Sequence, residues 1–574
     1  MCGIIAVLGE RAEENVLSAM LDAVRSRGPD GRETVSRDWF SVGFCRLAIY
    51  ALDAGRQPVE SADGAVTLAF NGEIYNVREL SDRFGIQAAS EAELLLAGYL
   101  AHGSDFAREL DGDFAVLIVD SKRRVCELWR DRFGVKPLYY AALPGRRFLV
   151  SSEIRGLLAH PEFVPAWDEL ALAERSVLTF WSVERTPFRG VRQVLPGHRL
   201  VIGPFGAADD ALRIEEIPIP PARTPSASIE GDLVAACTDA LARSVAKRVE
   251  HAHVSPIVVA LSGGIDSSLL AALARRASRE IVAVTICGGP DELDARYATL
   301  LATQLGIDHH LYPVTTERLL ECVPAVVLAQ PACGAFLAWF LGEAMERHAP
   351  GAKVLLCGEG ADEMFHGYRV HADPLAFQRQ ALDALAAVHD LAEGSPLLSR
   401  VRSWAHMDHR SFYDDVAGLF AGAQLVNRHL VPFDHGTMGR RVECRVPFLD
   451  PALLQISARR DRAELAAGKP LLRSVLAALP DIDAATREAL LTRRRTAGFT
   501  ATQAARAGLR QRLAERGLIR SPLASSPIAR FAGNPEELFW LGATHAVYFT
   551  HRGRIEGMDF ETLLDEALAA TPAW

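Results

Sequence analysis

The stretch from Pro256 to Ser268 (PIVVALSGGIDSS) has residue types that could hold a phosphate group. Its apolar run, Ile257–Leu261, is typical of a buried parallel strand, and the segment from Leu269 onward (LLAALARRA) predicts a helix. A strand, a glycine turn and a helix direct backbone N–H groups and a helix N-terminus at an anion. Asp266 would repel a phosphate unless a cation lay between them, so the pattern also predicts Mg²⁺. The residues expected around the phosphates are Ser262, Gly263, Gly264, Asp266, Ser267 and Ser268.

A second reactive arrangement lies at the N-terminus, where Cys2 follows Met1. Removal of Met1, which a small second residue permits, would give Cys2 both a thiol and a free α-amine. An α-amine has a pKa of about 8, low enough to act as general base for its own side chain. Cys2 is therefore a candidate nucleophile, although an apolar cysteine could also simply open a strand.

A third group of polar residues follows the apolar run Lys353–Cys357, in the sequence GEGADEMFHGY. The carboxylates of Glu359, Asp362 and Glu363 come at the C-terminal end of a predicted strand, where open α/β sheets bind ligands. Three anions there would repel ATP without a cation, so a metal–pyrophosphate site is the simplest interpretation. A solvated acidic loop is the alternative.

The glycine turn SGGIDSS is not a P-loop, because no lysine follows its glycines. It resembles the pyrophosphate loop of the ATP pyrophosphatases, which cleave ATP between the α- and β-phosphates to adenylate a substrate. The resemblance implies ATP and Mg²⁺ as cofactors, with AMP and pyrophosphate as products.

A longer series of motifs extends the resemblance over nearly the whole chain. It is similar to the glutamine-hydrolysing asparagine synthetases, a group of class II glutamine amidotransferases. The motifs are RSRGPDG (25–31), RLAI (46–49), QP (57–58), FNGEIYN (70–76), DRFGVKPLYY (131–140), SSEI (151–154), TPFRG (186–190), LPGH (195–198), RVPFLD (445–450) and GKPLLR (468–473). The resemblance implies a four-layer αββα N-terminal-nucleophile glutaminase domain, followed by a parallel-sheet α/β synthetase domain.

In the glutaminase half, the resemblance implies that Cys2 attacks the glutamine carboxamide and forms a thioester with release of ammonia. Asn71, through its side-chain amide, and Gly72, through its backbone N–H, would form the oxyanion hole. Arg46 would bind the α-carboxylate of glutamine, a task suited to a guanidinium, and Glu73 would hold its α-ammonium. The residues that match the family's glutamine site are Arg46, Leu47, Ile49, Glu73 and Glu91.

In the synthetase half, the resemblance implies that Glu359 contacts the adenylated intermediate or positions ammonia. Asp266 and Asp362 would bind the metal, and Lys469 or Arg473 could reach the phosphates. The positions that contact adenosine in the family are Leu261, Ile286, Cys357, which replaces a serine, and Gly358.

Two departures from the family pattern concern charged residues. Glu91 stands where the family has an aspartate, one methylene shorter, that binds the glutamine amine; a helix-capping carboxylate is the alternative role. In RRRTAGF (493–499), Thr496 stands where the family has a lysine, and Arg495 takes that place if the alignment shifts by one residue. Because a guanidinium does not simply replace an ammonium, this departure leaves the acceptor open.

The elements that must position these residues follow from hydrophobic periodicity. Strands are predicted at Ile281–Ile286 and Lys353–Cys357, and helices at Ile229–Val249 and Asp294–Leu305, an alternation typical of a parallel α/β sheet. The uncharged segment Cys322–Gly342 contains two prolines and predicts a buried core helix rather than a membrane span.

The chain of 574 residues is long enough for two or three domains. We predict a glutaminase domain at 2–202, a Pro/Gly/Ala-rich linker at 203–228, a synthetase domain at 229–520 and a helical, aromatic-rich extension at 521–574. The net charge of −10 argues against nucleic-acid binding as a main role. Nine scattered cysteines without a CxxC pair, and no leader peptide, favour a reducing cytoplasm.

The resulting prediction is a glutamine-hydrolysing, ATP-dependent amidotransferase that channels ammonia to an adenylated carboxylate, with aspartate as the default acceptor. One alternative is amidation of another carboxylic acid, in specialised metabolism or surface-sugar assembly. Another is intramolecular amide closure as in the β-lactam synthetases, although those relatives typically lose the N-terminal cysteine. A non-catalytic glutamine-binding protein is a fourth possibility. Homodimers are common in the family, so the resemblance also allows a homodimer.

Overall fold

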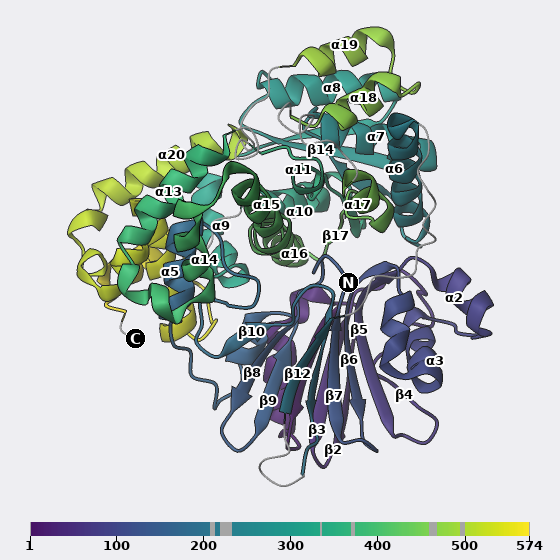
Figure 1. Cartoon of the computed structure of the whole chain (residues 1–574), viewed down its shortest axis with the longest axis vertical. Helices are drawn as coiled ribbons and strands as arrows, with labels where there is room; N and C mark the ends of the chain where they lie inside the picture. The colour runs from purple at the N-terminus through teal and green to yellow at the C-terminus, as the bar shows by residue number, and fades with distance from the viewer. Residues whose placement is uncertain are drawn as a thin grey trace.

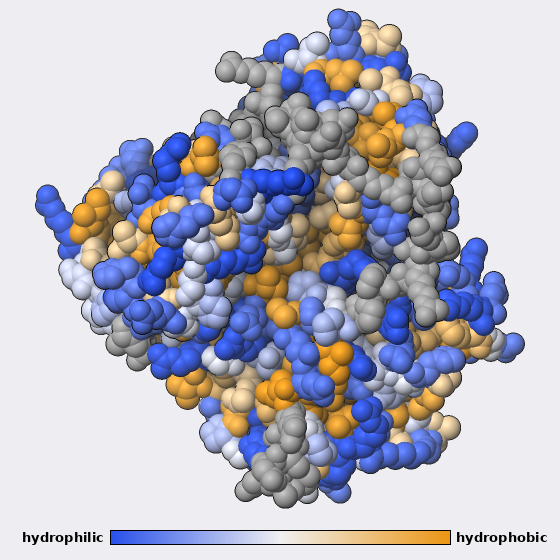
Figure 2. Space-filling model, viewed as in Figure 1, coloured by the Kyte–Doolittle hydropathy of each residue, from blue (hydrophilic) through white to orange (hydrophobic). Residues whose placement is uncertain are grey.

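The computed structural model describes residues 2–206, 213–218, 232–332, 336–368, 373–458, 468–493 and 500–572. Two stacked β-sheets form one half of the molecule, and a parallel sheet with many helices forms the other (Figure 1). Hydrophilic and hydrophobic residues are mixed over the face shown in Figure 2, in keeping with a chain that is 49% hydrophobic and 23% charged.

The N-terminal half contains two antiparallel six-stranded sheets. In spatial order, the first consists of β10 (Val191–Gln193), β8 (Tyr139–Leu143), β9 (Arg147–Ser151), β1 (Gly3–Leu8), β3 (Phe40–Arg46) and β2 (Gly31–Arg37). The second consists of β12 (Arg213–Pro218), β11 (His198–Gly203), β7 (Val125–Arg130), β6 (Gly112–Asp120), β5 (Val66–Ile74) and β4 (Val59–Glu60).

Strand β1 shows why the two sheets stack. Ile4, Ala6 and Leu8 face the core between the sheets, whereas Ile5 and Val7 join the core on the other face. Side chains alternate along a strand, so a strand that is apolar at every position is covered on both faces. Helices α1 (Glu14–Ala23) and α4 (Ile154–Leu158) cover the first sheet, and α2 (Val77–Phe84) and α3 (Glu91–His102) pack on the second. The predicted αββα fold is confirmed.

Strand β12 lies inside the segment predicted as a linker. It pairs with β11 over six residues, from Arg213 opposite Gly203 to Pro218 opposite His198. This part of the predicted linker therefore extends the second sheet. The Pro- and Gly-rich sequence on either side concealed the strand, and residues 207–212 and 219–231 lie outside the described ranges.

The second half is built on a parallel sheet. Its spatial order is β15 (Asp308–Pro313), β14 (Ile281–Cys287), β13 (Ile257–Ala260), β16 (Val354–Leu356) and β17 (Glu443–Arg445). Helices α6 (Leu233–Glu250), α7 (Ile265–Ala277), α8 (Leu293–Leu305) and α10 (Phe336–His348) alternate with these strands. The predicted parallel α/β sheet is confirmed, and α7 begins four residues earlier than the predicted helix. The strand order reverses at β13, and ligands bind at such a point in open α/β sheets.

Further helices surround this sheet. They include α9 (Thr316–Ala329), α11 (Ala361–Met364), α13 (Pro374–Ala386), α14 (Pro396–Ser403), α15 (His409–Leu419), α16 (Val431–Met438), α17 (Pro451–Ala458), α18 (Pro470–Ala478), α19 (Ala484–Thr492), α20 (Thr500–Glu515), α21 (Pro535–Thr544) and α22 (Phe560–Ala569). The segment Cys322–Gly342, predicted as one buried core helix, divides between α9 and α10, so the prediction of a single helix is wrong. Among the described residues, none of the helices is both long and apolar enough to cross a membrane.

The two halves are interleaved near the C-terminus. Helix α5 (Glu169–Leu178), which precedes β10, lies among the green and yellow helices of the other half (Figure 1). Trp167 stacks on Phe549 with ring centroids 4.9 Å apart. Arg552 donates to the main-chain carbonyls of Leu158, His160 and Phe163. The C-terminal segment is thus packed against both halves of the chain.

Candidate active sites

A pocket opens beside Cys2 in the N-terminal half. It encloses about 380 Å³ of empty space, part of it open to solvent. The lining residues are Cys2, Arg46, Leu47, Tyr50, Ala51, Gly55, Gln57, Phe70, Gly72, Glu73, Ser90, Glu91 and Ala92. Six of the eight residues predicted for glutaminase chemistry therefore surround one cavity. Asn71 lies next to it, and Ile49 is buried, with its carbonyl accepting from the His253 N–H.

Asn71 is held against the nucleophile candidate. The main-chain nitrogen of Cys2 lies 2.6 Å from Asn71 Oδ1, and burial raises the pKa of the Cys2 thiol. Asn71 Nδ2 is buried and, within the described structure, has no hydrogen-bond partner. A buried amide N–H without a partner is costly. The side chain is thus oriented by one atom and keeps the other as an available donor.

Position 72 requires a glycine because of its backbone conformation and the neighbouring strand. Its φ is +139°, and a Cβ at this position would lie 2.0 Å from the carbonyl oxygen of Asp113 on the neighbouring strand. Only glycine fits here. The glycine therefore lets β5 continue beside β6 while its backbone faces the pocket.

Arg46 supplies a cation to the pocket. Its guanidinium donates to the main-chain carbonyls of Leu52, at 3.0 Å, and Ala51, at 2.7 Å. Within the described residues it forms no ion pair with a carboxylate. A guanidinium positioned by neutral groups can bind an incoming carboxylate in a bidentate manner.

Glu73 and Glu91 supply the opposite charge. Glu91 Oε1 accepts from the Ile74 N–H at 2.7 Å and lies 2.9 Å from His251 Nε2, which is also 3.2 Å from Glu73 Oε2. Burial, followed by the charge of Glu73, raises the pKa of Glu91 to about 7. Burial alone would lower the pKa of His251, but the two carboxylates raise it to about 9.

His251 and a second cation reach the pocket from the other half of the chain. Arg445, on β17, lies 3.0 Å from Glu73 Oε1 and also binds Glu443 at 2.6 Å. The side chains of Glu73, Arg445 and Glu443, which form these two ion pairs, are all buried. The parallel-sheet half therefore supplies the cations that pair with the two carboxylates lining this pocket.

The predicted phosphate-binding turn lies at the reversal point of the parallel sheet. Ser267 Oγ accepts from the Ser262 N–H at 3.1 Å and donates to the Gly264 carbonyl at 3.2 Å, which closes the turn at the N-terminus of α7. Gly263 has a φ of +65°, and a Cβ there would lie 2.5 Å from Tyr297. Glycine is thus needed for both conformation and space. Ser268 is buried within the first turn of α7.

The two carboxylates predicted to bind Mg²⁺ converge. Lys469 Nζ lies 2.5 Å from Asp266 Oδ2 and 2.9 Å from Asp362 Oδ1. Although burial opposes it, these two carboxylates raise the pKa of Lys469, so the ammonium stays charged. Oxygen ligands that can share one cation suit Mg²⁺. The residues present therefore fit the ion.

The residues predicted to contact adenosine lie at the ends of three adjacent strands. Leu261 and Cys357 directly follow β13 and β16, and Ile286 is the last residue but one of β14. A Cβ on Gly358 would lie 3.3 Å from Cβ of Asp266, so the GEGADE loop packs directly on the phosphate-binding turn. The predicted residues thus gather at the carboxyl ends of neighbouring strands in the sheet.

Glu359 belongs to a chain of hydrogen-bonded side chains. Its Oε2 lies 2.8 Å from His429 Nδ1, and His429 Nε2 lies 2.9 Å from the Tyr368 hydroxyl, which donates to Glu363. Burial alone would lower the pKa of His429, but Glu359 and Glu363 raise it. Burial raises the pKa of Glu363 to about 7.

The remaining predicted cations differ in their placement. Arg473 donates to the Leu491 carbonyl, so it bridges α18 and α19 instead of the turn. Arg493, which the sequence analysis did not select, donates to the Ser262 carbonyl at 2.8 Å and pairs with Asp294. Arg495 and Thr496 lie outside the described residues.

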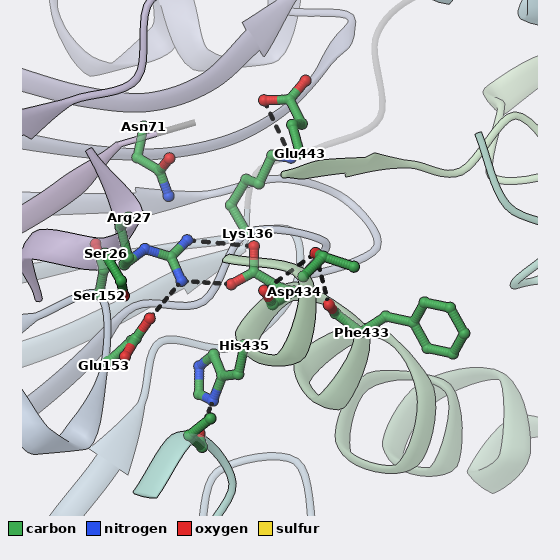
Figure 3. A network of polar contacts seen from close by, with 12 residues as sticks. Ser26, Arg27, Asn71, Lys136, Ser152, Glu153, Phe433, Asp434, His435 and Glu443 are labelled. Atoms are coloured by element: carbon green, nitrogen blue, oxygen red, sulfur yellow. Dashed lines mark hydrogen bonds and ion pairs between the residues drawn. The ribbon is translucent and has the colours of Figure 1, made fainter. Parts of the chain in front are cut away.

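A buried polar network joins the two halves beside Cys2 (Figure 3). Arg27 donates to the Cys2 carbonyl at 3.0 Å, to Glu153 at 2.9 Å and to Asp434 of α16 at 2.6 Å. Lys136, also buried, lies 3.9 Å from Glu443. The main chain of Cys2 is thus bound by a charge network that includes the other half of the chain.

The comparisons with known proteins agree with this two-site arrangement. Residues 1–209 match the family described as a glutamine amidotransferase domain, and residues 236–530 match the family described as asparagine synthase. The chain belongs to the asparagine synthase family.

Three curated relatives illustrate the range of this family. An asparagine synthetase of Bacillus subtilis is 27% identical over 80% of this chain and 81% of its own. The amidase chyE of Penicillium rubens is 31% identical over 64% of this chain and 59% of its own. The amidase chry2 of Gibberella zeae is 29% identical over 70% of this chain and 64% of its own. The matches thus span less than two thirds of the two fungal amidases.

Several site residues of this family member were missed by the sequence analysis. His251 follows the predicted helix Ile229–Val249, and His429 lies in a helical segment without a motif. Arg27, Lys136 and Arg445 stand inside motifs that carried the resemblance, but their pairing across the domain boundary has no sequence signal. The only indication in the sequence was that these charged residues stand among apolar ones, where charged side chains are usually paired.

Proposed function

We propose that this chain hydrolyses glutamine at Cys2 and uses the ammonia to amidate a carboxylate that ATP has adenylated. The observation that carries the proposal is the buried, available Asn71 Nδ2 beside Cys2, in a pocket with Arg46 at one place and the Glu73–Glu91 pair at another. An amino acid with a side-chain carboxamide has the matching carboxylate, ammonium and carbonyl groups.

The glutaminase step follows from these residues. After removal of Met1, the α-amine of Cys2 takes the thiol proton, and the sulfur attacks the carboxamide carbon. Asn71 Nδ2 and the Gly72 N–H stabilise the negative oxygen that develops. The amine then returns the proton to the leaving ammonia, and water hydrolyses the thioester to glutamate.

The synthetase step takes place at the reversal point of the parallel sheet. The substrate carboxylate attacks the α-phosphate of ATP, and pyrophosphate leaves toward the Ser262–Ser268 turn, Lys469 and Arg493. Asp266 and Asp362 would hold Mg²⁺, which supplies charge neutralisation on the phosphates. Ammonia then attacks the acyl carbon and AMP leaves, with the Glu359–His429 pair positioned to take the excess proton.

Aspartate is the default acceptor, because the family and the Bacillus subtilis relative are named for asparagine formation. A different carboxylic acid is the second candidate, supported by the two fungal relatives named amidases. Intramolecular amide closure has less support, since Cys2, Arg46, Asn71 and Gly72 are all retained. A homodimer and a cytoplasmic location stay predictions.

Pyrophosphate release tests the proposal. Purified protein is given ATP, Mg²⁺ and either glutamine or an ammonium salt, with L-aspartate or one member of a panel of carboxylic acids. Release that depends on one acid, and amide formation on that acid, would identify the acceptor. The Cys2→Ala variant should lose glutamine-dependent release and keep ammonium-dependent release. Equal loss of both would contradict the two-site scheme.

A further inference from the structure

His251 belongs to the parallel-sheet half and lies behind the pocket beside Cys2, against the lining residues Glu73 and Glu91. It follows α6, the helix that packs on α7 beneath the phosphate-binding turn. Its Nε2 lies 2.9 Å from Glu91 and 3.2 Å from Glu73, and its ring stacks on Tyr50 at 4.2 Å, with the two planes 7° apart. Tyr75 contacts the edge of the ring, with centroids 5.6 Å apart. The imidazole is therefore held on several sides.

We propose that His251 is the positioning residue for the α-ammonium group of glutamine, because it keeps the Glu91 carboxylate charged and oriented toward the pocket. This inference rests on the proposed function, since it takes the ligand of the pocket to be glutamine. His251 does not itself contact the reacting carboxamide.

The geometry of Glu91 supports this role. Oε1 is fixed by the Ile74 N–H and His251, and within the described residues no contact takes Oε2. Glu91 lines the cavity. One oxygen is thus anchored and the other stays available for an ammonium group.

The charges around His251 explain why a cation is needed there. Glu73 is already paired with Arg445, so the imidazolium is the partner that remains for Glu91. The charged and titratable groups that face the ring or its two carboxylates are Glu73, Glu91, Tyr50, Tyr75, His253, Lys247, Arg248 and Arg445. The Lys247 and Arg248 cations lie against the Tyr75 ring and pair with other carboxylates.

His251 also affects the charge state of Glu91. A buried carboxylate next to Glu73 has its pKa raised, and His251 opposes that shift through a hydrogen bond and its charge. Without His251, the pKa of Glu91 would rise further above about 7, so Glu91 would be mostly protonated at neutral pH and would attract an ammonium group less strongly. The pocket would then bind glutamine well only at higher pH.

The test is the pH dependence of the glutaminase KM in the full chain, measured as glutamate release between pH 6.5 and 9. At pH 7 we expect His251→Gln to raise the KM for glutamine about fivefold, the value for a rise of one unit in a pKa that starts at about 7, with kcat within about twofold of the natural protein. The ratio of the two KM values should fall toward one as the pH approaches 9. His253→Gln is the matched control, because His253 also packs on Tyr50, with centroids 4.4 Å apart, and binds neither carboxylate in the described structure.

A KM ratio near one at every pH would overturn the inference, and so would a constant ratio that does not change with pH, which indicates lost packing. Glu91→Gln, which removes the ionisable group itself, keeps the proposal testable if the His251 variant does not fold. It should raise the KM at all these pH values, and an unchanged KM would also refute the role. If the natural protein and the His253→Gln control release no glutamate, the proposed function fails instead.

Discussion

In the proposed glutaminase step, Asn71 is the side chain that acts most directly after Cys2. Its Oδ1 positions Cys2, and its Nδ2 is kept free of partners in the described structure. Removing one oxyanion donor costs about 100- to 1000-fold in kcat. We expect Asn71→Asp, which keeps an acceptor for the Cys2 nitrogen, to lose this much glutaminase kcat with a smaller change in KM. Steady-state glutamate release measures it.

Ammonium-dependent pyrophosphate release provides the control for that variant, because the synthetase site does not include Asn71. This activity should stay within about twofold of the natural protein. A kcat for glutamine hydrolysis within a factor of ten of the natural value would show that the oxyanion is stabilised elsewhere.

The contacts of Lys469 predict how Mg²⁺ affects the stability of a variant that lacks its ammonium group. Its ammonium neutralises Asp266 and Asp362, so Lys469→Met leaves two uncompensated carboxylates facing one another. Breaking a buried ion pair costs about 3–5 kcal/mol, and the loss here should be smaller because both carboxylates are partly exposed. The variant should melt at a lower temperature, and Mg²⁺ should raise its Tm more than that of the natural protein. Thermal denaturation with and without Mg²⁺ checks this, and equal shifts in both proteins would argue against a metal site.

Helix α16 connects the two halves of the molecule beside Cys2. Its Asp434 binds the buried Arg27, which also binds Glu153 and the Cys2 carbonyl. Arg27→Leu leaves two buried carboxylates without their shared partner, and we expect a loss of about 3–5 kcal/mol in the free energy of unfolding. Arg32→Gln is the control, because the exposed Arg32–Asp22 pair contributes at most about 1 kcal/mol. Urea denaturation of both variants measures the difference.

The ion pairs of Arg27 also predict how the stability of the protein depends on pH. Burial alone would raise the pKa of Glu153, but Arg155 and Arg27 lower it to about 2. A carboxylate with a lowered pKa in the folded state stabilises the protein above its unfolded pKa of about 4.3, and this contribution is lost as the pH falls toward 2. Between pH 5 and 3, the stability of the natural protein should therefore fall more steeply than that of Arg27→Leu. Parallel curves would show that Glu153 does not depend on Arg27.

Elements of regular period could be predicted from the sequence, and contacts between distant elements could not. The strands Ile257–Leu261, Ile281–Ile286 and Lys353–Cys357 could be located because apolar periodicity is local. Strand β12 was missed because only six residues of pattern lie between Pro- and Gly-rich stretches. The motifs located Cys2 and Asp266, whereas His251 and Arg493 reach their sites through packing of helices distant in sequence.

At the scale of the whole molecule, the C-terminal segment is structural support for both halves. The Tyr548 hydroxyl donates to the Leu328 carbonyl of α9, and Arg552 binds three carbonyls beside α4. A chain that ends at residue 520 would expose the apolar surfaces of both halves on which this segment packs. We expect such a chain to lose glutaminase activity as well as pyrophosphate release, although every predicted site residue is retained. Full glutamate release from the shortened chain would contradict this expectation.

The helical segment η5 (Phe420–Leu430) has the wider π-helical winding and joins α15 to α16 without a break. It carries Asn427, which binds Gln193 and the Ser182 carbonyl of the N-terminal half, two residues before His429, which binds Glu359. Deleting one residue from an α-helix turns everything beyond it by about 100°. A deletion here would rotate Asp434 away from Arg27 while each remaining side chain kept its identity. Natural variation in this stretch should therefore preserve the number of residues more strictly than their types.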